Sequence, residues 1–152
     1  MTSWKKYQGF LKGLTHLRIT SRAFKSVKRD RRFSDFNRHA TYMRALNAEL
    51  WELVFTAGTP WHQVPNLFRA RTGIELVRGL GKQSNKDPKF ATARKFVDGG
   101  RVYSADYHVG WGARPSDVKF FRINFDIDFE ARQFVIDGLL AHVPNYSAQF
   151  LH

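Results

Sequence analysis

The sequence of 152 residues contains no cysteine, which excludes a disulfide framework and a zinc site built on thiolates. It also lacks long apolar runs. No stretch approaches the roughly 20 apolar residues that cross a bilayer, and the first 14 residues lack the apolar segment of a signal peptide. We therefore expect a cytoplasmic protein with no membrane partner.

Several catalytic motifs are absent as well. The chain has no GxGxxG, GxxxxGK[ST] or GxSxG sequence, which argues against a dinucleotide enzyme, a P-loop NTPase and an α/β-hydrolase. The six histidines show neither HxxxH nor HExxH spacing, and acidic residues do not cluster with them. We expect neither a metal site nor a cofactor.

Acidic residues are scarce in the first third of the chain. The whole sequence has 25 Lys and Arg against 13 Asp and Glu, a net charge of +12, and residues 1–44 hold 12 of these basic residues but only two acids. Such asymmetry indicates an anionic partner, most commonly a phosphate backbone, although an acidic protein fits equally and a solvated basic surface is the simpler alternative. The predicted nucleic-acid-binding residues are Arg22, Lys25, Lys28, Arg29, Arg31 and Arg32.

What the sequence does have is a globular composition, with 43% hydrophobic and 15% aromatic residues, consistent with a single domain over residues 1–152. The clearest local pattern is a strict alternation at residues 120–129, which predicts a half-buried strand. Its apolar face is Phe121, Ile123, Phe125, Ile127 and Phe129. Its polar face is Arg122, Asn124, Asp126 and Asp128.

Together with this strand, residues 101–109 and 133–143 predict an antiparallel C-terminal meander. The spacing of apolar residues predicts one long helix that starts at Ser34 or Asp35 and ends before Gly58. Shorter elements are a strand within residues 14–20, a basic helix capped by Ser21, a short helix in 61–71 and an exposed loop at 81–89. Residues 1–13 are either a flexible arm or one or two amphipathic turns, because Trp4, Tyr7 and Phe10 recur at steps of three. The expected fold is therefore α+β: an antiparallel sheet of four or five strands packed against one long and one or two shorter N-terminal helices.

The polar face of the meander contains the residues best suited to chemistry. His108 could act as a general acid or base, and Arg122 could bind a phosphate. The alternative is an ordinary solvated sheet face with cross-strand charge pairs. His142 stands where the last strand ends, and could be either a catalytic group or a polar terminator.

The order strand, basic helix, longer helix and meander resembles the RelE/ParE superfamily of small bacterial toxins. The matching segments are LRITSRAFKSV at 17–27 and FFRINFDIDFEARQFVI at 120–136, the latter followed by HVPNY at 142–146. The resemblance implies that Arg122 contacts the scissile phosphate, and that His142 and Tyr146 supply acid/base or mRNA-positioning groups. RelE-type members cleave mRNA on the ribosome with the 2′-OH as nucleophile, whereas ParE-type members poison gyrase.

Two hypotheses follow. The first is a RelE-like, metal-independent endoribonuclease toxin that acts on RNA and has a cognate antitoxin. The second is a non-enzymatic basic protein that binds nucleic acid or an acidic protein; an origin in a phage or mobile element would suit it. The role of residues 58–100, where the chain is longer than typical members of the superfamily, stays open at this point.

Overall fold

The computed structural model describes residues 3–29, 33–78, 94–113 and 118–140. The helical elements are α1 (Trp4–Lys12), α2 (Ser21–Arg29), α3 (Phe36–Ala45), the π-helical turn η1 (Leu46–Leu50), α4 (Trp51–Phe55), the 3₁₀ turn η2 (Trp61–Gln63) and α5 (Val64–Thr72). The strands are β1 (Leu17–Ile19), β2 (Val77–Arg78), β3 (Lys95–Asp98), β4 (Arg101–Ser104), β5 (Tyr107–Trp111), β6 (Phe121–Asp128) and β7 (Gln133–Gly138). The predicted α+β class is confirmed.

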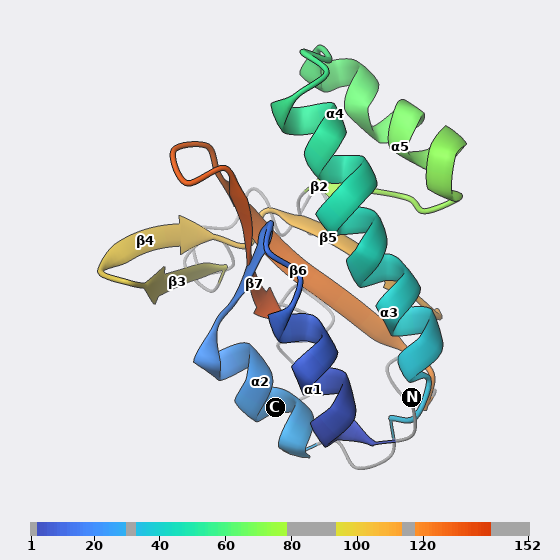
Figure 1. Ribbon diagram of the computed structural model, residues 1–152, viewed down its shortest axis with the longest axis vertical. Coiled ribbons are helices and arrows are strands. Elements are labelled where there is room, and N and C mark those ends of the chain that lie inside the picture. Colours follow the sequence, from blue (N-terminus) through green and yellow to red (C-terminus); the bar gives the residue numbers. More distant parts are fainter. Residues whose placement is uncertain (1–2, 30–32, 79–93, 114–117, 141–152) are drawn as a thin grey trace.

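Five strands form the main sheet in the order β1-β7-β6-β5-β2, and β3 and β4 form a separate two-stranded hairpin (Figure 1). The predicted antiparallel meander is present as β5, β6 and β7. The sheet is nevertheless mixed, because β1 pairs with β7 in parallel, with Leu17 opposite Phe134. The alternation of a three-residue strand specifies its buried face but not its direction, so no local pattern could reveal this.

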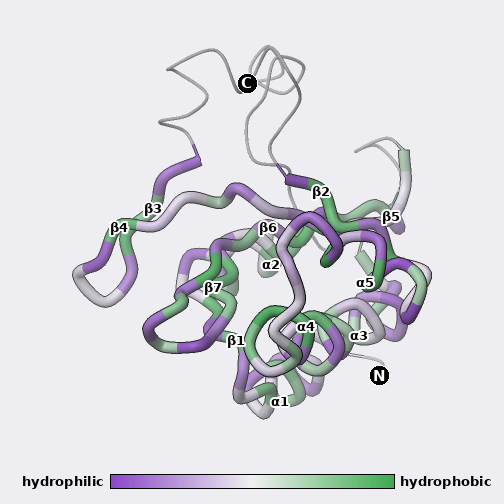
Figure 2. Tube along the Cα trace, turned by 90° about the horizontal axis from the view of Figure 1, so that it is seen from above, coloured by the Kyte–Doolittle hydropathy of each residue, from purple (hydrophilic) through white to green (hydrophobic). Residues whose placement is uncertain are grey.

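The core lies between the sheet and the helices. Phe121, Ile123 and Phe125 of β6 are fully buried against α1, α3 and α4, which Figure 2 shows together on one side of the sheet. Phe134, Val135 and Ile136 of β7 are all buried, as expected for a strand that is covered on both faces. Within the described residues, no helix is long and apolar enough to cross a membrane.

The predicted strand over residues 101–109 is in fact two strands that belong to different sheets. Gly99 and Gly100, both with positive φ, turn the chain between β3 and β4. After β4, the amide of Ala105 bonds to Arg94 O, and β5 then enters the main sheet beside β6. Alternation continues through both halves, so the local pattern looks like one strand.

Phe129 also departs from its predicted place: it lies beyond the end of β6 and is 66% exposed.

The N-terminal helices differ from the prediction in two ways. Residues 1–13 were expected as a flexible arm, but α1 is a helix whose Tyr7 and Leu11 are buried in the core. The cap of α2 is Thr20 rather than Ser21, because the Thr20 Oγ1 accepts a hydrogen bond from the Ala23 amide at 3.1 Å.

The predicted long helix is a continuous helical segment made of α3, η1 and α4, with a π-helical turn in its middle. The Asn47 carbonyl in this turn accepts a hydrogen bond from His16 Nδ1 at 2.8 Å, and the Asn47 side chain accepts one from the His16 amide at 3.0 Å. The His16 ring also stacks on Trp51 at 3.7 Å between centroids. These contacts tie the start of β1 to the helix.

The loop predicted at 81–89 lies outside the described residues.

Candidate nucleic-acid interface

The first three elements of the fold carry only positive charge. Residues 3–29 hold eight Lys and Arg and no Asp or Glu. Within α1 and α2, the described lysine side chains are all exposed, and we refer to them as the lysine surface. The lysine surface consists of Lys5, Lys6, Lys12 and Lys25.

Helical periodicity explains why these lysines point outward. Tyr7 and Leu11 occupy the buried face of α1, and Ala23 and Val27 occupy that of α2, each pair four residues apart. The two helices touch: the Lys12 ammonium lies 5.9 Å from the centroid of the Phe24 ring. Figure 1 shows α1 and α2 side by side, so the lysine surface is spread over two neighbouring helices.

Arg22, predicted as a phosphate ligand, holds α2 to the sheet. Its guanidinium forms a two-pronged ion pair with Asp137 of β7, in which Nε lies 3.1 Å from Oδ1. Thr20 Oγ1 donates to the same carboxylate at 3.0 Å. The hydrogen bond to Asp137 is the main reason that the pKa of Arg22 is raised. This arginine therefore has a structural partner already.

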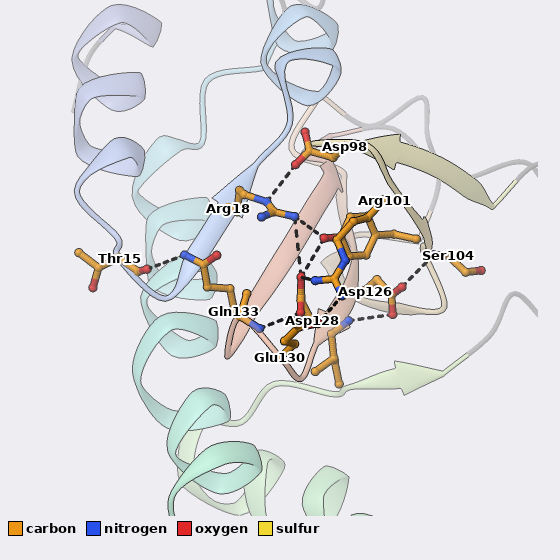
Figure 3. Close-up of polar contacts among 12 residues, drawn as sticks. Thr15, Arg18, Asp98, Arg101, Ser104, Asp126, Asp128, Glu130 and Gln133 are labelled. Carbon is orange, nitrogen blue, oxygen red and sulfur yellow. Dashed lines mark hydrogen bonds and ion pairs between the residues drawn. The ribbon is translucent and has the colours of Figure 1, made fainter.

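A second cluster of ionic contacts anchors the β3–β4 hairpin to the main sheet (Figure 3). The Asp128 carboxylate, 4% exposed, accepts a hydrogen bond from Tyr103 Oη at 2.8 Å and forms an ion pair with Arg101 at 3.3 Å. Arg18 of β1 lies between the two parts, 2.9 Å from Asp98 and 3.9 Å from Asp128. The Ala131 amide and these cationic and hydroxyl neighbours lower the pKa of Asp128.

Arginines and the lysine surface differ in their partners. Eight of the ten carboxylates in the described ranges form ion pairs, and in every case the partner is an arginine. Within those same ranges, no carboxylate pairs with the lysine surface. The paired arginines stabilise the fold, and the lysine surface keeps its charge exposed to solvent.

Arg122 lies on the polar face of β6, as its alternation predicts, and crosses over Gly110 of β5. Its Nη1 donates to the carbonyls of Trp111 at 3.0 Å and Phe121 at 2.9 Å, and its Nη2 donates to Gly112 O at 2.7 Å. Partial burial lowers its pKa. The guanidinium thus binds the backbone where β5 and β6 meet, and it would have to leave these carbonyls in order to grip a phosphate.

His108 shares the polar face with Arg122. It stands opposite Asn124 in the β5–β6 register, and Arg122 stands opposite Gly110, two positions further along β5. The structure therefore brings these two predicted residues onto neighbouring strands.

Four other predicted residues lie outside the described ranges: Arg31, Arg32, His142 and Tyr146. Lys28 and Arg29 belong to the last turn of α2.

One buried histidine was not anticipated from any sequence pattern. His39 of α3 is 1% exposed and connects three parts of the core. Its Nε2 donates to the Leu139 carbonyl at 2.8 Å, which fixes the tautomer, so its Nδ1 accepts from Tyr7 Oη at 2.5 Å. Burial lowers the pKa of His39 to about 4 and raises that of Tyr7. Both groups are neutral at physiological pH and bind α1 to the core.

Sequence reasoning also missed Lys5, Lys6 and Lys12, because it treated α1 as a flexible arm. The signal that could have found them is the complete absence of acids before Asp30. Among the described residues, no group of three or more His, Asp or Glu is placed to hold a metal ion. Comparison with known proteins adds no further guide: no family model, curated protein or solved structure matches the chain.

Proposed function

We propose that the protein binds nucleic acid, with RNA as the expected partner, and that the lysine surface on α1 and α2 makes the phosphate contacts. The observation that carries this proposal is the separation of charge: the carboxylates pair with arginines of the fold, and the exposed lysines stand in a segment that has no acid. Lysine ammonium groups bind phosphates as mobile point charges. Such contacts secure the backbone without reading sequence.

The test is the salt dependence of binding, measured by fluorescence anisotropy with labelled single-stranded RNA. Each phosphate contact with a single strand contributes about 0.7 to the slope of log K against log salt. Replacing Lys12 and Lys25 by Gln should therefore reduce the slope by about 1.4. The matched control is Lys95→Gln with Arg69→Gln, which removes the same net charge from exposed positions on β3 and α5.

The control double variant should keep nearly the whole wild-type slope. If it loses as much as the Lys12 and Lys25 variant, only net charge matters and the lysine surface is not the site. If the wild-type protein binds neither RNA nor DNA at physiological salt, the proposed function is wrong. An acidic protein would compete for the same surface, and its displacement of bound RNA would identify that alternative.

A second candidate is the metal-independent endoribonuclease suggested by the resemblance to RelE/ParE toxins. Two observations favour it: the elements β1, α2, α3–α4 and the β5–β6–β7 meander occur in the expected order, and His108 and Arg122 share one sheet face. In this candidate Arg122 neutralises the phosphorane charge, and His108 or His142 moves the proton. A cytoplasmic location and a cognate antitoxin belong to the same proposal.

Expression in a bacterial host without a partner gene tests the second candidate. A toxin would arrest growth and fragment RNA, and His142→Ala would abolish both effects but leave RNA affinity nearly intact. Arg122→Ala should also abolish cleavage, but it removes three backbone hydrogen bonds, so its folding is checked by circular dichroism. Normal growth and intact RNA at high expression would remove the enzyme and leave the binding function.

A further inference from the structure

A cavity of about 450 Å³ opens on the flank of α3 that faces the end of β5. It is lined by Asp35, Asn37, Arg38, Thr41, Tyr42 and Trp111. The site is shallow and open to solvent, so it could hold one flat group against its wall but would not enclose a whole ligand. Helix α1 packs on the other flank of α3, where Arg44 lies 4.7 Å from the Phe10 ring centroid. The lysine surface and the cavity therefore lie on two sides of one helix.

The central feature of the cavity is a guanidinium stacked on an indole. The Arg38 guanidinium carbon lies 3.7 Å from the Trp111 ring centroid, and Arg38 Nε lies 3.5 Å from an Asp35 carboxylate oxygen. Trp111 covers one face of the planar group, and Asp35 holds one edge. The Arg38 side chain is still 37% exposed and lines the cavity, so we infer that a ligand would meet the guanidinium on the face opposite Trp111.

A planar cation held in this way is a platform for another flat group. Unpaired nucleobases stack on aromatic rings and on guanidinium planes, and they form hydrogen bonds through edges that a duplex would occupy. Tyr42 offers a hydroxyl group beside this platform, and Thr41 Oγ1, which donates its own hydrogen to the Asn37 carbonyl at 3.1 Å, can accept a hydrogen bond there. Burial raises the pKa of Tyr42, so its hydroxyl remains a neutral donor. The cavity combines a stacking surface with donors and acceptors at its rim.

The surroundings of the cavity suit a nucleotide rather than an isolated base. Arg38 and Asp35 neutralise each other inside it, so a phosphate must find its cation outside. The Arg122 guanidinium donates to the Trp111 carbonyl at 3.0 Å, so its positive charge lies beside the cavity and attracts phosphates even while its N–H groups are bound. Helix α1, which carries three residues of the lysine surface, packs on the other side of α3. A strand whose phosphates follow these charges could place one base in the cavity.

We propose that this cavity binds one unpaired nucleobase of a single-stranded RNA, stacked on the Arg38 guanidinium with Trp111 behind it. This inference rests on the proposed nucleic-acid binding and adds a preference to it. Bases inside a duplex are stacked on each other and cannot enter the cavity. The lysine surface therefore holds the backbone of any nucleic acid, and the cavity selects single strands.

The test compares a labelled 12-nucleotide single-stranded RNA with a 12-base-pair RNA duplex. Arg38→Ala should weaken binding of the single strand by about 5- to 150-fold, the range for losing one stacked base, and change duplex affinity less than twofold. Arg71→Ala is the matched control, because Arg71 is similarly exposed, at 40%, and also forms surface ion pairs, with Glu49 and Glu52. It should change neither affinity by more than twofold.

Photocrosslinking supplies a second readout. RNA that contains 4-thiouridine should crosslink to Trp111 or Tyr42 in the wild-type protein, and Arg38→Ala should lose that product. Crosslinks confined to α1 and α2, or an Arg38→Ala protein that binds single strands normally, would overturn the inference. Equal binding of free UMP and the 12-mer would show a mononucleotide site instead. If Arg38→Ala is silent but the Lys12 and Lys25 variant is weakened, the proposed function stands without the cavity.

Discussion

The buried histidine of α3 makes a prediction whose size follows from the structure. The pKa of His39 is lowered from 6.5 to about 4 in the folded protein because its ring is buried. Below pH 6.5 the unfolded chain binds a proton that the folded protein excludes, so stability must fall as the pH falls from 6.5 toward 4. At 1.36 kcal/mol per pKa unit, the loss reaches about 2.5 kcal/mol at pH 4.5 and about 3 kcal/mol below pH 4.

Urea unfolding from pH 7 to pH 4.5 measures this loss directly. His39→Gln cannot titrate, so its free energy of unfolding should vary less with pH than that of the wild type, and the difference between the two proteins should shrink by about 2.5 kcal/mol. At pH 7 the variant is expected to be less stable, because it cannot reproduce both hydrogen bonds of His39. His62→Gln, the same change at an exposed position on η2, serves as the control.

Two results would refute the reasoning about His39. Parallel pH profiles of the wild type and His39→Gln between pH 6.5 and 4.5 would mean that this histidine is not held neutral in the core. An equal flattening by His62→Gln would mean that the effect comes from any lost histidine rather than from burial. The comparison stops at pH 4.5 because the titration of carboxylates dominates the pH dependence of stability below that value. The lowered pKa of Asp128 adds to the loss there, and the raised pKa of Asp126 opposes it.

Gly110→Ala should destabilise the protein by about 1–3 kcal/mol in thermal melts, because its Cβ would lie 2.5 Å from Arg122 Cδ and 2.5 Å from Phe121 O. Gly9→Ala, which faces open space on α1, should instead stabilise by about 0.5–1 kcal/mol, and equal effects of the two would contradict the close approach. Asp128→Asn should cost about 1.5–3 kcal/mol, because it removes the charge that binds Arg101 and Arg18. Asp128→Asn should also speed amide hydrogen exchange at Tyr103 in the β3–β4 hairpin. An unchanged exchange rate there would show that apolar contacts alone hold this hairpin to the main sheet.

The parts of the fold that depend on local periodicity were predictable. Alternation identified β6 and the three-stranded meander, and the three- and four-residue spacing identified the helical segment from α3 to α4. The short helix expected in residues 61–71 is present as η2 and α5, and Gly73, in a left-handed conformation, ends α5. In each case the apolar pattern and the turn residues agree with the tertiary structure, because the same residues that favour the element also bury its face.

Features that depend on distant partners were not predictable. A nine-residue helix such as α1 is too short to be stable alone, and it is held in place because Tyr7 reaches His39, 32 residues away. A histidine among polar residues of a helix looks exposed in sequence, and only the Leu139 carbonyl and the Tyr7 hydroxyl make its burial tolerable. The parallel pairing of β1 with β7 likewise joins segments more than 100 residues apart.

The candidate site was predicted in outline and differs in its details. The basic N-terminal third carries the lysine surface, but Arg22 is paired with Asp137 and the lysines of α1 were overlooked. Arg122 lies on the expected face, yet its contacts with three carbonyls depend on Gly110, whose missing side chain makes room for it. The Arg38–Trp111 stack joins positions 73 residues apart, which no local pattern could reveal.

Because the arginines form the ion pairs of the fold and the lysine surface is exposed, the affinity for a polyanion and the stability of the fold should respond differently to ionic strength. Ammonium groups on an open surface are screened strongly by added salt, whereas ion pairs built on nearly buried carboxylates, such as Asp128 and Asp137, are screened much less. Concentrated salt should therefore elute the protein from a polyanionic matrix in its folded state. For the proposed nucleic-acid binding, this means that a change in ionic conditions would release the bound strand and leave the fold intact.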